Sequence, residues 1–166
     1  MRRNIEVIDG TLETLTSIAR DLCDDDRVEL AVTREVEDPE ALARDALRGE
    51  FCKVVTLAHE PVFAFGAWRC QPATAVVWGF KTPQGRAVIR TVTKYIKRRL
   101  IPDLRAIGIS HGMCLVHPDN KYSQRWLSHL GYYPLGQTTD IGTRQPMIIY
   151  RYDDDAPDQA GRAAAA

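Results

Sequence analysis

The side chains best suited to acid–base, nucleophilic or metal chemistry in this sequence are its four histidines and four cysteines. His111 and His117 are six residues apart, on a predicted strand and the loop after it, which does not favour a shared metal ion. No CxxC pair occurs, which indicates reduced, mostly buried thiols rather than a zinc site or a disulfide framework. No spacing suggests a Ser-His-Asp or Cys-His arrangement. We therefore predict no metal site and no nucleophilic cysteine; the cysteines are Cys23, Cys52, Cys70 and Cys114.

Basic residues form a second group with chemical potential, the binding of anions. They lie in the segment 83–104, predicted as the longest helix because apolar residues recur every four positions from Val88 to Leu100. Their positions, mainly off this apolar stripe, would allow contact with nucleic acid or an acidic partner. A solvated helix face is the alternative, because acidic and basic residues balance at 22 each and no interleaved aromatic residues favour single-strand binding. The basic residues are Arg90, Lys94, Lys97, Arg98 and Arg99.

The elements that position these side chains form one predicted α/β domain over residues 1–152. Their order predicts a mixed central sheet of about six or seven strands with about four helices on both faces. Residues 153–166 are predicted to be a flexible acidic and Ala-rich tail. The predicted strands are 5–8, 51–58, 62–68, 73–80, 107–116, 132–141 and 146–152, and the predicted helices are 12–22, 39–47, 83–104 and 121–130. Thr11 and Asp38 are the predicted caps of the first two helices, and Pro102 is expected to kink or stop the third.

Two features of the sequence bear on where the protein is located in the cell. Arg2 and Arg3 are followed by no apolar stretch, so the N-terminus does not resemble a secretory signal. No run approaches the roughly 18 apolar residues that a membrane span needs. We expect a protein of the cytoplasm or of a particle assembled there, and not a secreted one.

The segment NKYSQRWLSHLGY, residues 120–132, resembles the signature N-x-x-A-x-x-L-Y-x-x-x-G-[FY] of the GNAT N-acyltransferases, the GCN5-related fold. Ser123 stands at the small position, Trp126 at the apolar position, and Gly131 ends the helix in a left-handed conformation. The order of the predicted elements also resembles the GNAT layout. The resemblance implies a GNAT fold and acetyl-CoA as the candidate cofactor.

If acetyl-CoA binds, the resemblance implies that its pyrophosphate meets the start of the long helix, where GNAT proteins carry [QR]-x-x-G-x-[GA]. The aligned segment, 82–87, keeps the small residues at its end but has Thr82 in place of Gln or Arg. Pro83 removes one backbone donor, and a plain helix start is the alternative interpretation. The residues implied to bind the cofactor are Lys81, Gln84, Gly85, Arg86, Ala87 and Asn120.

Acyl transfer needs a base for the incoming amine and often an acid for the leaving thiolate. The resemblance aligns Leu127 with the tyrosine that serves as this acid in many GNAT proteins, and the strand 73–80 contains no carboxylate. Catalytic residues are therefore unassigned, and only substitutes can be named. The substitute bases are Glu60 and His59, and the substitute acids are Tyr122, Tyr132 and Tyr133.

A narrower resemblance connects residues 38–135 with small GNAT-like proteins of short-tailed phages, of the internal virion protein A type. It rests on PEAL at 39–42, EPVFAFG at 60–66, VWGF at 77–80 and RWLSHLGY at 125–132. It implies a virion-associated or assembly protein without conventional catalysis, which acts through contacts with virion components or with a second copy of itself. The alternatives are an acyl-CoA-dependent N-acetyltransferase for a host protein or small amine, and a nucleic-acid-binding module.

Overall fold

The computed structural model describes residues 4–34, 38–139 and 144–154. Seven strands form one sheet in the order β1-β2-β3-β4-β5-β7-β6. All neighbours are antiparallel except β4 and β5, which are parallel. This arrangement confirms the predicted mixed sheet. The strands are β1 (Ile5–Asp9), β2 (Phe51–Leu57), β3 (Glu60–Gln71), β4 (Thr74–Lys81), β5 (His111–Val116), β6 (Tyr133–Thr139) and β7 (Pro146–Asp153).

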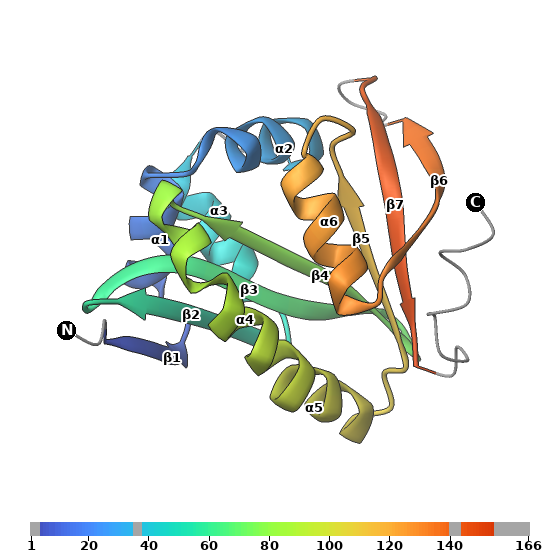
Figure 1. The fold of residues 1–166 in the computed structure, drawn as a ribbon, viewed down its shortest axis with the longest axis horizontal. Helices are drawn as coiled ribbons and strands as arrows, with labels where there is room; N and C mark the ends of the chain where they lie inside the picture. Colours follow the sequence, from blue (N-terminus) through green and yellow to red (C-terminus); the bar gives the residue numbers. More distant parts are fainter. Residues whose placement is uncertain (1–3, 35–37, 140–143, 155–166) are drawn as a thin grey trace.

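Helices cover both faces of the sheet (Figure 1). One face carries α1 (Leu12–Arg20), α2 (Asp24–Arg34) and α3 (Pro39–Ala46). The other face carries a long helix and α6 (Lys121–Leu130). The long helix runs through η1 (Pro83–Val88), α4 (Ile89–Tyr95), η2 (Ile96–Leu100) and α5 (Ile101–Ala106).

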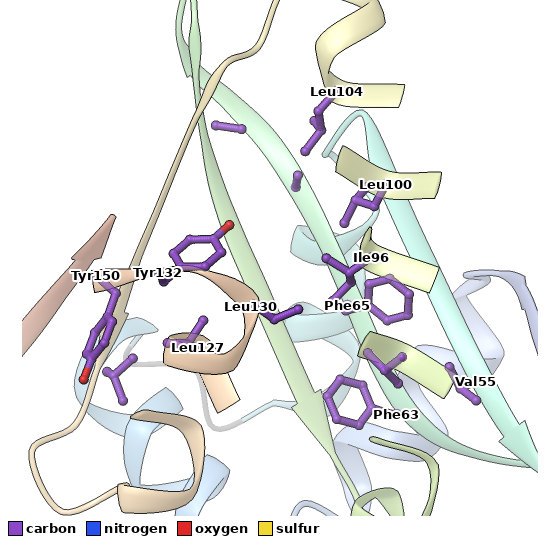
Figure 2. Close-up of a cluster of buried hydrophobic side chains, with 14 of the residues drawn as sticks. Val55, Phe63, Phe65, Ile96, Leu100, Leu104, Leu127, Leu130, Tyr132 and Tyr150 are labelled. Carbon is purple, nitrogen blue, oxygen red and sulfur yellow. The ribbon is translucent and has the colours of Figure 1, made fainter. Parts of the chain in front are cut away.

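Alternation along the strands separates two cores. Val55 and Phe65 point to the face of the long helix and α6, whereas their neighbours Val54 and Ala64 point to the face of α1 and α3. Figure 2 shows the first core, in which Leu130 of α6 lies close to side chains of the long helix and to Phe65. The chain thus buries one helical layer on each side of the sheet, as the predicted pattern required.

The long helix passes Pro102 instead of stopping there. Its start is a 3₁₀ turn, and its residues Ile96–Leu100 form a wider π turn directly before Pro102. A proline inside a helix lacks an N–H and clashes with the carbonyl one turn earlier, and a π turn accommodates such a local mismatch. The sequence analysis expected Pro102 to kink or stop the helix, but the helix continues to Ala106.

The acidic run Asp24–Asp26 forms the first turn of α2, a helix that the sequence analysis did not predict. Carboxylates are favourable at a helix N-terminus because the backbone N–H groups there are positively polarised. Val28 of this helix is exposed, so the apolar spacing that marks an amphipathic helix is weak. This missed helix matters because it faces the candidate site.

The predicted helix caps are confirmed. Thr11 and Asp38 accept hydrogen bonds from the first turns of α1 and α3, and Gly131 ends α6 at φ 96°. The strand predicted at 132–141 ends at Thr139 within the described residues, and 140–141 lie outside them. β7 extends to Asp153, one residue beyond the predicted strand, whereas residues 155–166 of the predicted tail lie outside the described part of the chain.

Candidate functional site

A cleft runs through the sheet between β4 and β5. The two strands pair only from Thr74 with His111 to Val76 with Met113, although β4 continues to Lys81 and β5 to Val116. The parallel strands therefore separate beyond this point, and the space between them has a volume of about 960 Å³. Because part of the edge of β4 has no strand beside it among the described residues, an extended ligand with amide groups could pair there.

The cleft has an apolar side and a charged side. Its apolar side is formed by α6 and the long helix, including Leu127, Leu130 and Leu100, which Figure 2 shows over the sheet. Its other side receives carboxylates from α2 and from the region of α3. An apolar passage lined by a few polar groups is the usual form of a small-molecule site. The carboxylates that line it are Asp26, Glu29, Asp45 and Glu50.

Glu29 is the carboxylate best suited to proton transfer. It projects from α2 into the cleft, where the backbone N–H of His117 and the side-chain amide of Asn120 donate to its Oε2, at 3.1 Å and 2.9 Å. Burial raises the pKa of Glu29 above its ordinary value, and these two hydrogen bonds oppose that rise without cancelling it. A fixed carboxyl with a raised pKa in a cleft has the properties of a general base.

Asn120 uses both ends of its amide inside the protein. Its Oδ1 accepts the N–H of Ser123 and caps α6, while its Nδ2 holds Glu29. The side chain is buried. The geometry connects Asn120 to Glu29, and the implied binding of the cofactor by Asn120 stays a prediction.

Lys81, at the end of β4, is buried and paired with Asp26 of α2. Its Nζ lies 2.8 Å from Asp26 Oδ1, and its backbone N–H donates to Oδ2 of the same carboxylate, also at 2.8 Å. Burial disfavours the charged ammonium, but Asp26 outweighs this effect and raises the pKa of Lys81. The ammonium is thus fully occupied by a carboxylate that the protein supplies.

Arg86 is the exposed cation at the start of the long helix. Its guanidinium pairs with Asp25 at 2.8 Å and lies over the ring of Tyr122, with Cζ 4.7 Å from the ring centre. Gln84 and Ala87 are exposed beside it. Gly85 is buried, and a Cβ added there would lie 2.5 Å from the carbonyl oxygen of Val62. Gly85 therefore serves close packing of the helix start against β3.

The predicted acid and base substitutes are dispersed. Tyr132 lines the cleft, and burial raises its pKa, so its hydroxyl stays protonated. Tyr122 lies in a different groove, between the long helix and α6. His59 lies in the exposed turn between β2 and β3, Glu60 is the exposed first residue of β3, and neither lines the cleft.

Leu127, which replaces the expected tyrosine, is buried and lines the cleft. Tyr133 lies at the start of β6 and donates to Asp153. Neither position adds an acid to the cleft.

The described residues contain no group of three or more His, Cys, Asp or Glu side chains that could hold a metal ion. The cysteines are free thiols; Cys23 is buried, Cys52 and Cys114 are half-buried, and Cys70 is exposed, which differs from the expectation of mostly buried thiols. In the part of the chain that the structure describes, no helix has the length and apolar character to cross a membrane.

Solved structures confirm the fold. The chain aligns with yncA of Salmonella typhimurium, solved with its cofactor acetyl-CoA, at 19% identity and a TM-score of 0.66, over 93% of this chain and 98% of that one. It aligns with the ribosomal-protein-S5-alanine acetyltransferase of Vibrio fischeri at 19% identity and TM-score 0.60, over 92% and 96% of the two chains. Ard1 of Thermoplasma volcanium gives 14% identity and TM-score 0.69, over 90% and 97%.

No family model and no curated protein matches the sequence. The chain therefore has a GNAT-like fold, shared with acetyltransferase structures at low identity. The narrower resemblance to phage virion proteins stays a prediction.

Glu29 is the residue of the candidate site that sequence reasoning missed. It lies in α2, where no helix was predicted, and its partners are 88 and 91 residues away in the chain. The acidic first turn of α2 was a usable signal for the helix. Nothing in the local sequence marks Glu29 itself.

Proposed function

We propose that this protein is an acetyl-CoA-dependent N-acyltransferase. The observation that carries the proposal is the cleft between β4 and β5 with the half-buried Glu29 at its charged side. The fold shared with yncA, a structure that contains acetyl-CoA, supports the same cofactor here.

The residues present fit this cofactor. The apolar side of the cleft and the unpaired part of β4 suit an extended arm with amide groups, and Arg86 with Gln84 lies exposed at the start of the long helix for its phosphates. Bound acetyl-CoA supplies an activated acetyl thioester. Because Lys81 is already paired with Asp26, phosphate binding rests mainly on Arg86 and on backbone N–H groups.

Glu29 would accept the proton that an attacking amine loses. Its Oε2 is held by two N–H donors, which fixes the carboxyl group, and its raised pKa brings it closer to neutral pH. The C–S bond of the thioester breaks as the new C–N bond forms, and the released thiolate takes a proton from solvent. No side chain of the described cleft has to change its charge except Glu29.

Calorimetry with acetyl-CoA and CoA, followed by an acetyl-transfer assay on amines, tests the proposal. The variant Leu115→Trp adds bulk in the cleft at a side chain that is 40% exposed, and Leu135→Trp adds the same bulk on β6, at a side chain 54% exposed that does not line the cleft. We expect micromolar binding that Leu115→Trp weakens at least tenfold and Leu135→Trp leaves unchanged. No binding at millimolar acetyl-CoA would reject the proposal.

A second function is favoured by a separate observation, the ion pairs at the start of the long helix. Lys81 pairs with Asp26 and Arg86 pairs with Asp25, so both cations implied to bind the cofactor already have a carboxylate partner. In addition, Leu127 stands where the resemblance expects a tyrosine acid. A GNAT-fold protein without catalysis, acting by protein contacts in a phage particle or its assembly, fits these facts. It predicts no acetyl-CoA binding in the titration above, and the presence of the protein in purified particles by mass spectrometry.

A further inference from the structure

A second concave surface lies outside the cleft, between the long helix and α6. This basic groove has a volume of about 680 Å³, and its floor includes Ile89, Tyr122 and Trp126. Its rims carry basic side chains from both helices. They are Arg90, Lys94, Lys97, Arg98, Arg125 and His129.

The basic side chains of the groove, five of them lysine or arginine cations, have no acidic partners within the residues that the structure describes. No ion pair among the described residues involves any of the six, whereas Arg44, Lys53, Arg86, Arg105 and Arg151 each pair with a carboxylate. The sequence contains no Asp or Glu between Lys81 and Pro102 or within α6, and none lines the groove. Because the whole chain has equal numbers of acidic and basic residues, its net charge of zero does not reveal this local excess of positive charge.

The basic side chains are arranged in two rows. Arg90, Lys94 and Arg98 are spaced four apart on the long helix, and Arg125 and His129 are spaced four apart on α6. Residues four apart on a helix share one face and are separated by about 6 Å along its axis. Two such rows along one groove suit a chain of regularly spaced negative charges better than a single anion.

The floor between the rows is aromatic and fixed. The indole of Trp126 donates to Thr93 Oγ1 at 2.9 Å and packs edge-on against Phe63 at 5.7 Å between ring centres. Trp126 and Tyr122 remain half-buried, so part of each ring is accessible from the groove. An acidic peptide without aromatic residues has no rings to stack on such a floor. A DNA duplex keeps its bases inside and leaves the floor unused.

We propose that the basic groove binds single-stranded nucleic acid, with phosphates along the two rows and bases against Trp126 and Tyr122. Single-stranded DNA and RNA share this chemistry. The groove and the cleft share Trp126, but the basic side chains of the groove do not line the cleft, so the inference does not depend on acyl transfer.

Fluorescence anisotropy with a labelled oligothymidylate of about 15 nucleotides tests the inference. Four to five phosphate contacts predict a slope of log K against log salt of about −3. The variant Lys94→Glu/Arg98→Glu should weaken binding at least tenfold and make the slope shallower. The matched control, Arg20→Glu/Arg44→Glu, makes the same charge change on α1 and α3 and should bind like the parent protein.

Contact between the bases and Trp126 can be measured separately. Quenching of tryptophan fluorescence by the oligonucleotide should be reduced in Trp126→Phe, and thermal unfolding of each variant should confirm that the fold is kept. An oligouridylate of equal length distinguishes RNA from DNA, and tight binding of either supports the inference.

The inference is overturned by any of five results, of which four concern binding of the oligonucleotide itself. These are no anisotropy change up to about 100 μM protein at low salt, equal loss in the control variant, equally tight binding of a duplex, or equal competition by polyglutamate of the same charge. Displacement by stoichiometric acetyl-CoA would also overturn it, because the oligonucleotide would then occupy the cleft.

Discussion

Asn120 Nδ2 donates a hydrogen bond to Glu29 Oε2 over 2.9 Å, and so the residue that caps α6 also holds a carboxylate of α2. The two helices lie on opposite faces of the sheet (Figure 1). The connection fixes Glu29 at the cleft without using a residue of the central strands. It explains how a GNAT-like fold can carry a base although β4 has no carboxylate.

Glu29→Gln should abolish most acetyl transfer. Glutamine keeps an oxygen that can accept from His117 and Asn120 but cannot take a proton from an amine, so we expect kcat/KM to fall about 100-fold or more. The raised pKa of Glu29 means that activity of the parent protein increases with pH as this carboxyl loses its proton, and the variant should lack that increase. Glu60→Gln, at the exposed first residue of β3, is the control and should retain full activity.

Asn120→Asp separates the two roles of Asn120. Aspartate keeps the oxygen that caps α6, but it loses the donor to Glu29 and adds a negative charge beside it. The pKa of Glu29 should therefore rise further, and the pH–activity profile should move to higher pH. Asn120→Ala should in addition lower the free energy of unfolding by about 1 kcal/mol through the lost cap. An unchanged profile in Asn120→Asp would remove Asn120 as a positioning residue.

Asp26→Ala should strongly destabilise the protein. It leaves the buried ammonium of Lys81 without its partner, a change that costs about 3–5 kcal/mol in comparable buried pairs. The double variant Asp26→Leu/Lys81→Met removes both charges and should recover most of this loss. Urea denaturation of the three proteins gives the comparison, and equal destabilisation of both variants would contradict the role of charge.

Gly85→Ala should lower the free energy of unfolding by about 1–3 kcal/mol. The added methyl would lie 2.5 Å from the carbonyl oxygen of Val62 and 2.6 Å from Lys81 Cβ, so the helix start must move away from the sheet. Gly79→Ala on β4 is the matched control, because its nearest contacts would be 3.4 Å away. Thermal denaturation should show a clear decrease for the first variant and little change for the second.

Asp153→Asn should make stability less sensitive to acid. Burial alone would raise the pKa of Asp153, but donation from Tyr133, Arg151 and His111 outweighs it and lowers the pKa. The carboxylate therefore stabilises the fold above its unfolded pKa of about 3.9, and this contribution disappears as pH falls through the lower folded value. The parent protein should exceed the variant by about 1–3 kcal/mol at pH 7 and lose this advantage at a pH below the folded pKa of Asp153. An equal difference at both pH values would contradict the assignment.

Much of the fold follows from local signals in the sequence. Thr11, Asp38 and Gly131 mark helix ends with side chains or backbone conformations that have few alternatives, and all three positions are confirmed. The apolar repeat of the long helix predicted its length despite Pro102. α2 was missed because its contacts, such as the one between Asp26 and Lys81, come from tertiary structure and not from apolar spacing.

The candidate site was less predictable than the fold. The resemblance named Lys81 and Asn120 as cofactor ligands, but it could not show that a helix from the N-terminal third of the chain supplies partners for both. Glu29 has no local motif, and its chemistry arises only from burial and from donors 88 and 91 residues away. Hydrogen bonds between residues so far apart in the chain depend on how the helices pack, so a short sequence motif cannot predict them.

The short β4–β5 pairing has a mechanical consequence. With three residue pairs at this junction, the sheet consists of two antiparallel halves, one of β1 to β4 and one of β5, β7 and β6, whose backbones pair with each other only over this short stretch. Such a junction is a natural place for local opening, with faster amide exchange on β4 beyond Val76 than on β3. A molecule lying in the cleft would take the place of missing backbone pairing. Ligand binding should therefore slow amide hydrogen exchange at the β4–β5 junction, which lies in the middle of the sheet and not at an edge strand.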